Sequence, residues 1–185
     1  MTRVYLKRNF DTGNYTPGAS KFKLGVWHIT SVLFFRSKLI PSSSLLISVL
    51  RLFGAKIGKD VRIKPGVEIK FPWRLKIGDN SWVAECYIEN LDYVTIGNNC
   101  CISQKVTLIT GNHNYKSENF DLIVKPIQIF DGAWIGAGSI IGPGVVVNTD
   151  AVLSVGSVAT KDLAANTVYQ GNPAKPIRER FKFSS

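Results

Sequence analysis

A rhythm of six residues runs from Ile96 to Leu163 and constrains this chain more than any other feature. Aliphatic residues or alanine open each later block, and these openers are Ile129, Ile135, Ile141, Val147, Leu153 and Ala159. The fifth position is also small or aliphatic, as in Ala133, Ser139, Val145, Ala151, Ser157 and Leu163. A period of six fits neither an amphipathic helix nor an alternating strand. We therefore predict an all-β solenoid whose sides are short parallel strands, with the opening side chains stacked in its core.

The rhythm continues upstream in shifted frames, opened by Ile57, Ile63 and Ile69, then Ile77 and Val83, then Ile96, Ile102 and Leu108. The shifts fall at 71–76, 89–95 and 112–127, and each predicts an insertion or a corner. The longest, NHNYKSENFDLIVKP, is polar and irregular, and loops of this length are more often functional than idle. A Gly-rich β-sandwich with coincidental spacing is the alternative, but a fixed period favours the solenoid.

The amino-acid composition is typical of a single domain with a hydrophobic core. Of 185 residues, 45% are hydrophobic and only 19% charged, which gives no indication of long disorder. The three cysteines form no C-x-x-C pair, and an odd count with an adjacent pair is a poor disulfide framework. The N-terminus has no apolar core after its basic residues, so we do not expect a signal peptide. These features predict a cytoplasmic protein.

The positive charge is concentrated in residues 1–56, which hold nine Lys or Arg and one acid, giving +8 of the total +10. This predicts an anionic partner, such as a membrane surface or a glycan. Zinc-finger spacing and RNP-like aromatic patterns are missing from the sequence, so we expect no nucleic acid.

Two apolar runs in this basic segment predict helices over about 22–38 and 42–53, with Ser42 or Ser43 as the cap of the second. Charged residues and Pro41 interrupt the runs, so neither is long enough to span a membrane. The favoured interpretation is a helical cap over the N-terminal end of the solenoid. The alternative is a peripheral membrane contact at the inner face of the membrane, and different faces of one helix could serve both.

The hexads, the TGNHNY loop and the closing VATKDLAANTVYQGNPAKPIRE resemble the left-handed β-helix O-acetyltransferases, also called hexapeptide-repeat acyltransferases. The segments RLFGAKIGKDVRIKPGVEIKFPWRLKIGDNSWV, ISQKVTL, FDLIVKPI and GNPAKPIRER are most similar to enzymes of the colanic-acid type, which acetylate exopolysaccharide building blocks. The resemblance covers nearly the whole chain from Arg51. It implies left-handed coils, a homotrimer of parallel prisms, and acetyl-CoA in a groove between neighbouring subunits. We accordingly divide the chain into a basic helical segment (1–56), a β-helix (57–171) with an active-site loop at 111–127, and a basic tail (172–185).

Acetyl transfer to a sugar hydroxyl needs a base, and histidine is the side chain best matched to that role. His28 lies in an apolar run and is expected to be a packed residue, whereas His113 lies in the long loop and matches the family's catalytic histidine by resemblance. A carboxylate or a carbonyl should orient its ring, and the candidates are Asp11, Glu85 and the backbone of the loop. We also assign Glu85, Asn90 and Asp11 as candidate acceptor contacts, with ordinary corner residues as the alternative for the first two.

The remaining candidates concern acetyl-CoA. By resemblance, Ala137, Val155 and the turn Thr160-Lys161 contact the pantetheine arm. Trp134 opens the coil after the loop and either walls the thioester or simply fills a corner. Lys175 and Arg178 in the tail are suited to the phosphates of CoA. The sequence has no P-loop, so a groove should hold the CoA.

Three other functions compete with O-acetylation. Zinc carbonic anhydrases share the fold but need about three histidines around one metal, and this chain has two, so we expect no metal. A non-catalytic glycan-binding solenoid is the second alternative, and an N-acetyltransferase acting on an amino-sugar is the third. The sequence leaves open whether the acceptor is a free sugar, a nucleotide-sugar or a lipid-linked oligosaccharide.

Overall fold

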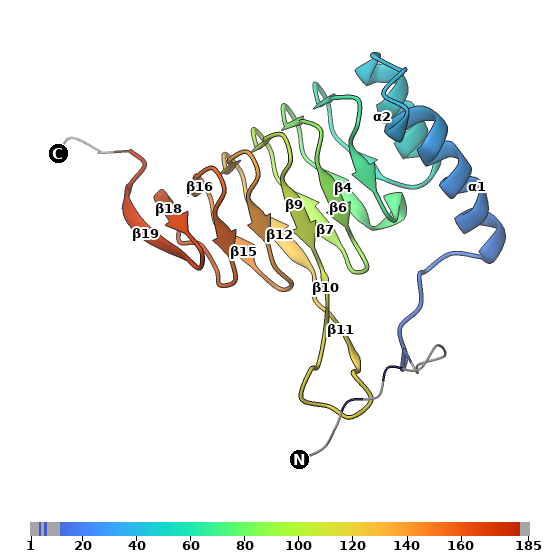
Figure 1. Ribbon diagram of the computed structural model, residues 1–185. Helices are drawn as coiled ribbons and strands as arrows, with labels where there is room; N and C mark the ends of the chain where they lie inside the picture. The colour runs from blue at the N-terminus through green and yellow to red at the C-terminus, as the bar shows by residue number, and fades with distance from the viewer. Residues whose placement is uncertain (1–3, 5, 7–11, 182–185) are drawn as a thin grey trace.

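In a computed structural model, which describes Val4, Leu6 and residues 12–181, the chain winds into a left-handed parallel β-helix of about six turns (Figure 1). Each turn contributes one short strand to each of three sheets. Sheet A holds β1 (Lys56–Ile57), β4 (Leu75–Ile77), β7 (Val94–Ile96), β12 (Ile127–Ile129) and β15 (Val146–Val147). Sheet C holds β3 (Glu68–Ile69), β6 (Tyr87–Glu89), β9 (Thr107–Ile109), β14 (Ile140–Ile141) and β17 (Val158–Ala159).

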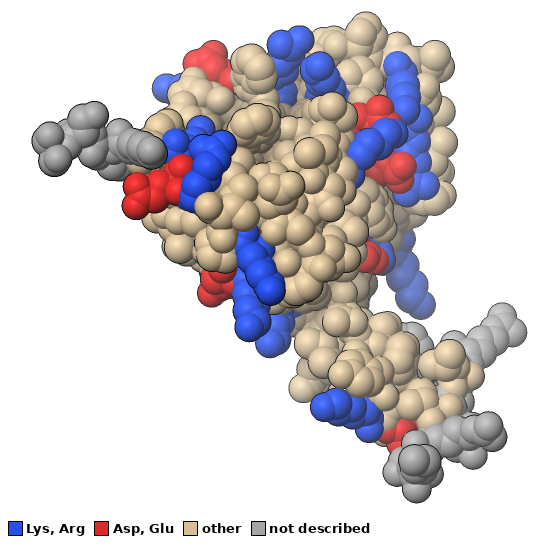
Figure 2. Space-filling view, turned by 60° about the vertical axis from the view of Figure 1, so that its left-hand side comes forward, with Lys and Arg blue, Asp and Glu red and all other residues tan. Residues whose placement is uncertain are grey.

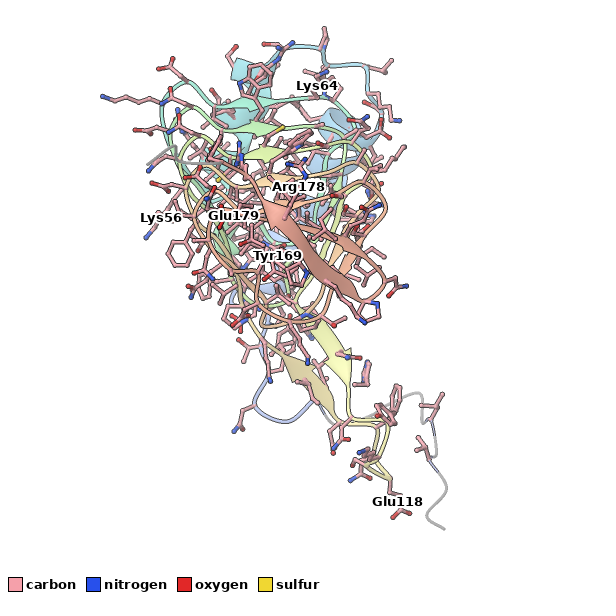
Figure 3. The ribbon with its side chains drawn as sticks, turned by 90° about the vertical axis from the view of Figure 1, so that its left-hand side faces the viewer. Lys56, Lys64, Glu118, Tyr169, Arg178 and Glu179 are labelled. Carbon is pink, nitrogen blue, oxygen red and sulfur yellow. The ribbon has the colours of Figure 1, made fainter. Side chains whose placement is uncertain are left out.

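Sheet B is the longest of the three and ends in an antiparallel pair. It holds β2 (Arg62–Ile63), β5 (Trp82–Val83), β8 (Cys101–Ile102), β13 (Trp134–Ile135), β16 (Val152–Leu153), β18 (Thr167–Gly171) and β19 (Ala174–Glu179). β19 runs antiparallel to β18, so residues 174–179 of the predicted basic tail form a strand. The β18–β19 hairpin lies across the C-terminal end of the prism, where Figure 3 labels Tyr169 and Arg178.

The predicted core is confirmed. All block-opening residues of the hexads are buried, and so are the fifth-position residues from Ala133 to Leu163. The openers stack in register along each sheet, as in the row Ile57, Ile77, Ile96, Ile129 and Val147 of sheet A. Two fifth-position residues are serines, whose buried hydroxyls have backbone partners: Ser139 donates to the Ser154 carbonyl at 2.8 Å, and Ser157 accepts from the Gly171 amide at 3.0 Å. The coils therefore share one continuous hydrophobic core.

The breaks in the rhythm have distinct structural causes. A 3-10 turn at Pro72–Arg74 accounts for the first shift, since Pro at its start fixes the backbone there. The step from Val83 to the buried Ile88 is five residues, so the second shift begins one corner earlier than the sequence indicates. The third break is not irregular: it forms an antiparallel hairpin of β10 (Gly111–His113) and β11 (Leu122–Val124).

The N-terminal segment forms the predicted helical cap. Helix α1 (Lys21–Ser31) continues into a π-helical turn (Val32–Arg36), and α2 (Ser43–Leu52) begins at Ser42, whose hydroxyl accepts from the Leu45 amide. Both helices lie at the end of the prism opposite to β19 (Figure 1). No helix among the described residues is long and apolar enough to cross a membrane. The three cysteines are free thiols, with Cys86 and Cys100 buried.

Candidate active site

A groove of 610 Å³ runs along the outer face of sheet B at its C-terminal end. Its floor comes from β13, β16 and β18, and it is lined by Ser103, Gln104, Trp134, Gly136, Ala137, Val152, Leu153, Ser154, Val155, Val168, Arg178 and Arg180. The floor is mainly apolar, and the two arginines come from the β19 side. A long apolar trough with cations at one side suits a ligand that joins a flexible arm to phosphates.

Four of the seven residues predicted to contact acetyl-CoA line this groove: Trp134, Ala137, Val155 and Arg178. The indole of Trp134 is 48% exposed, so it does not fill a corner of the core. Its Nε1 donates to the Ser103 hydroxyl at 3.0 Å, which fixes the ring against the groove wall. Trp134 therefore lines the groove, and its contact with the thioester stays a prediction.

The other three predicted contacts lie outside the groove. Thr160 and Lys161 are exposed at the corner that follows β17, which belongs to sheet C. Lys175 is exposed on β19, where it pairs with Gln170 near the turn of the β18–β19 hairpin. Within one chain, these three residues do not join the lining that contains Arg178.

The hairpin that carries His113 leaves the prism between β9 of sheet C and β12 of sheet A (Figure 1). Its base is fixed by Thr110, a fully buried residue whose hydroxyl donates to the Glu89 carbonyl at 2.8 Å and accepts from the Asp92 amide at 3.0 Å. A Cβ atom at Gly111 would lie 2.5 Å from a methyl group of Leu91, so a larger residue at this position would have to displace the Leu91 side chain.

The His113 ring is oriented by a backbone carbonyl within the hairpin. Its Nδ1 lies 2.8 Å from the Phe120 carbonyl oxygen, and the two rings stack with centroids 4.4 Å apart and planes 8° from parallel. A carbonyl oxygen can only accept, so Nδ1 carries the hydrogen in the neutral ring and Nε2 is the basic nitrogen. Among the described residues, the backbone of the loop is a predicted orienting group that contacts the ring, through the Phe120 carbonyl.

Phe120 has a φ of +52°, in the left-handed region that a bulky residue seldom adopts. The neighbouring turn is tied by Asp121, which accepts from the Ser117 hydroxyl through its side chain at 2.5 Å and from the Asn114 amide through its carbonyl at 2.8 Å. This conformation directs both the ring and the carbonyl of Phe120 at His113. Such strained residues are found preferentially at functional sites.

His113 and the groove lie on opposite sides of one chain. The prism has three faces, and the edge between sheets C and A, where the hairpin originates, is opposite the face formed by sheet B. Figure 3 shows the hairpin extending away from the prism, with Glu118 near its far end. His113 is not among the residues that line the groove. A single chain therefore separates the two parts of the candidate site.

Glu85 lies on the edge between sheets B and C, where it follows β5, and is held by two lysines. Its Oε1 contacts the Lys38 ammonium at 2.9 Å and the Lys105 ammonium at 2.5 Å. Hydrogen bonds from Lys105 and then Lys38 lower the pKa of this carboxyl to about 2. The contact with Lys38 ties the helical segment to the prism, which is a structural role that the sequence did not suggest.

Asn90 is fully buried, and its side chain is used by the backbone of the preceding coil. Its Oδ1 accepts from the Phe71 amide at 2.9 Å, and its Nδ2 donates to the Phe71 carbonyl at 2.6 Å. This geometry favours the corner residue over the acceptor contact. Asp11 lies outside the described residues.

Sequence reasoning missed four polar residues of the groove: Ser103, Gln104, Ser154 and Arg180. Ser103 and Gln104 follow β8 and resemble any other polar corner pair, so no pattern distinguishes them. Arg180 is anchored to the prism, because its guanidinium donates to the Gly132 carbonyl at 2.6 Å and lies 3.8 Å from the Asp150 carboxylate. Its position two residues after Arg178 in an extended segment was the available signal, since such residues share one face of a strand.

Comparison with known proteins finds relatives over most of the chain. A protein of Escherichia coli K12 named colanic acid biosynthesis acetyltransferase WcaF is 44% identical over 133 residues, which cover 71% of this chain and 73% of the relative. Galactoside O-acetyltransferase of the same organism is 34% identical over 136 residues, covering 71% and 67%. A solved galactoside acetyltransferase in complex with coenzyme A superposes with a TM-score of 0.76 at 25% identity, covering 89% of this chain and 85% of that one. No family model matches the chain.

Proposed function

The chain belongs to the hexapeptide-repeat acetyltransferases, and from this premise we propose that it moves an acetyl group from acetyl-CoA to a hydroxyl of a sugar or polysaccharide precursor. The names of the two E. coli relatives support a carbohydrate acceptor, and the first supports a place in exopolysaccharide biosynthesis. The CoA complex of the galactoside acetyltransferase supports CoA as the carrier.

The observation that carries the proposal is the hydrogen bond between His113 Nδ1 and the Phe120 carbonyl. It leaves Nε2 of the neutral ring with a lone pair, which a general base needs. In the proposed reaction Nε2 takes the proton of the acceptor hydroxyl while the hydroxyl oxygen attacks the thioester carbon. The C–S bond then breaks, and the same proton passes to the departing sulfur. The products are an acetyl ester and free CoA, with no net change in protons.

The groove on sheet B suits the donor. In the proposed complex the pantetheine arm lies over Val152 and Val168, Trp134 borders it, and Arg178 contacts the phosphates. Arginine binds phosphate through two parallel hydrogen bonds, which makes it a strong partner for this part of CoA. Lys175 is the nearby exposed cation that could assist from the rim.

The separation of His113 from the groove supports the predicted homotrimer. When parallel prisms pack around a threefold axis, the hairpin edge of one subunit can face sheet B of the next. The exposed Thr160 and Lys161 follow β17 on that same edge between sheets C and A, so they would also reach a neighbour's groove. In this arrangement each of three sites takes its histidine from one subunit and its groove from another.

The test uses ligand stabilisation, which needs no knowledge of the acceptor. A ligand that binds only the folded state stabilises it by about 2.7 kcal/mol at a hundredfold excess over its dissociation constant. We expect acetyl-CoA to raise the unfolding midpoint of the wild type and of His113→Ala, but clearly less for Arg178→Ala at the same concentration. If an intact wild type shows no response, the proposal fails and the glycan-binding solenoid becomes the better account.

Product analysis then separates the acceptors. With acetyl-CoA and a set of sugars, the expected product is an acetyl ester, which mild base hydrolyses. An amide that survives this treatment would identify the chain as an N-acetyltransferase instead.

A further inference from the structure

Helix α1 and the turn after it expose a stripe of apolar side chains. We call Phe22, Val26, Ile29 and Leu33 the α1 stripe; they are spaced four, three and four residues apart and so share one face of the helix. Their exposed fractions lie between 38% and 81%. Contiguous apolar surface of this kind usually marks an interaction site.

The opposite face of the same helix is already used. Trp27, Ser31 and Phe35 follow one another at four-residue spacing and are buried. The indole of Trp27 donates to the Ile69 carbonyl of sheet C at 3.1 Å and packs 5.5 Å from the Phe35 ring. The α1 stripe, on the far side of the helix, therefore points away from the prism end on which α1 lies (Figure 1).

The charge of this segment is one-sided. Residues 12–59 contain no Asp or Glu and hold seven cations: Lys21, Lys23, Arg36, Lys38, Arg51, Lys56 and Lys59. Two of them make ion pairs at the base of the cap, Arg36 with Glu68 at 3.1 Å and Lys38 with Glu85, but their side chains remain about half exposed. Figure 2 brings the opposite side of the molecule, which carries the C-terminal end of the prism, toward the viewer, and there both blue basic and red acidic side chains are visible.

We propose that the α1 stripe docks into the interface of an anionic lipid bilayer, with the helix lying parallel to the membrane surface. An amphipathic helix of this kind buries its apolar face at the boundary between headgroups and acyl chains, while basic residues attract anionic lipid. The helix is too short to span the bilayer, so it lies on the surface. This inference goes beyond acetyl transfer and does not depend on it.

The positive charge around the α1 stripe favours anionic lipid, and not a second copy of the chain, as the partner that covers the stripe. Two caps meeting stripe to stripe would bring seven cations of one segment against seven of the other, and like charges across an interface oppose association. In the proposed homotrimer the prisms are parallel, so the three caps lie at one end. Three stripes could then contact one bilayer together, which strengthens binding without new contacts.

The test is flotation of the full chain with vesicles of phosphatidylcholine, with or without phosphatidylglycerol. We expect the wild type to float with the anionic vesicles at low salt and much less with the neutral ones, since each Lys or Arg near an anionic surface contributes roughly fivefold. The double variant Ile29→Gln, Leu33→Gln should lose roughly a hundredfold, because burying one such side chain is worth about tenfold.

The control makes the same chemical change at the other end of the prism. Ile177 on β19 is 52% exposed, and Ile177→Gln should float like the wild type. Both variants alter exposed residues, and unchanged unfolding midpoints and unchanged acetyl-CoA stabilisation would show that they fold. The proposal is overturned if the wild type does not float with anionic vesicles at low salt, or if the double variant floats equally. It is also overturned if the stripe instead drives lipid-free association beyond the native oligomer.

Discussion

In the prism, every inward side chain is buried between the coils above and below it, whereas no residue of the β10–β11 hairpin and its turn, 111–126, is buried. The prism strands pair in parallel with partners 16 to 33 residues away, while β10 and β11 pair with each other. The prism is therefore held by a shared core and the hairpin by its own hydrogen bonds. Segments with few buried contacts open at lower free energy than core segments.

The contrast shows where geometry is set in this protein. Prism residues are held in place by packing against the coils above and below them, so a groove on sheet B can be apolar and rigid. The hairpin must orient His113 locally, through Phe120 and the turn tied by Asp121. Substitutions in the two regions should accordingly affect different measurements, with activity responding to the hairpin and unfolding responding to the prism.

The largest effect is expected from His113→Ala. Removing a general base costs about 10²-fold to 10⁴-fold in rate, so kcat for acetyl transfer should fall by that amount. His113 is not part of the core, and the unfolding midpoint should stay close to that of the wild type. Steady-state kinetics and thermal unfolding of one preparation provide the check. A loss below about tenfold with an intact fold would remove the histidine from the proposed chemistry.

A matched pair of aliphatic truncations compares the two regions directly. Leu108→Ala in β9 should lower the free energy of unfolding by about 2 to 5 kcal/mol, because the fully buried side chain leaves a cavity between Ile88 and Ile141. Ile123→Ala in β11 should cost about 0.5 kcal/mol, since that side chain is exposed. Denaturant unfolding of both variants gives the comparison. Equal losses would mean that the hairpin is stabilised by a core that the single chain does not reveal.

The same contrast explains what could be predicted from the sequence. Each coil repeats the same pattern, in which the residue that opens the block is buried. The burial of the openers from Ile57 to Ala159 could therefore be predicted from periodicity alone. The hairpin occurs once and repeats no pattern of the coils. Its strands are three residues long and its turn is long, so the local sequence pattern did not distinguish it from an irregular loop. The short step to Ile88 was missed because a single shortened corner leaves no second copy to compare with.

The residues of the candidate site were predicted less completely than those of the core. The resemblance suggested Ala137 and Val155, while position after the loop suggested Trp134 and positive charge suggested Arg178, and these four residues share one groove. The same reasoning named Thr160, Lys161 and Lys175, which a single chain leaves outside it. Sites that depend on contact between subunits cannot be assembled from one chain's pattern.

Phe120→Gly tests whether the hairpin sets the histidine locally, with an intermediate effect. Glycine accepts the φ of +52° and keeps the carbonyl that holds Nδ1, but it removes the stacked ring. As a positioning residue, Phe120 should contribute about tenfold to kcat, with little change in the KM for acetyl-CoA. The readout is the split between kcat and KM together with the pH profile. An equal loss in Phe120→Ala and Phe120→Leu, but none in the glycine variant, would show that backbone strain matters and the ring does not.

The smallest effect is expected at Glu85, where the prism meets the helical cap. Lys105 and Lys38 lower its pKa from 4.5 to about 2, so the folded state favours the ionised form. A group with a depressed folded pKa stabilises the protein above its unfolded pKa, and the stabilisation is lost as pH falls. The wild type should therefore be slightly more stable than Glu85→Gln above about pH 4.5, with the difference disappearing between pH 4.5 and about 2.

Thermal unfolding of both proteins across this range is the measurement, with Glu118→Gln at the exposed hairpin tip as the control that should show no such trend. The effect is small because all three side chains are partly exposed and salt screens the pairs, so it should shrink further at high ionic strength. If Glu85→Gln instead leaves stability unchanged at every pH and raises the KM of a sugar acceptor, the carboxylate belongs to a site shared with a neighbouring subunit. The division between a structural prism and a catalytic hairpin would then be too simple, because an edge of the prism would also bind substrate.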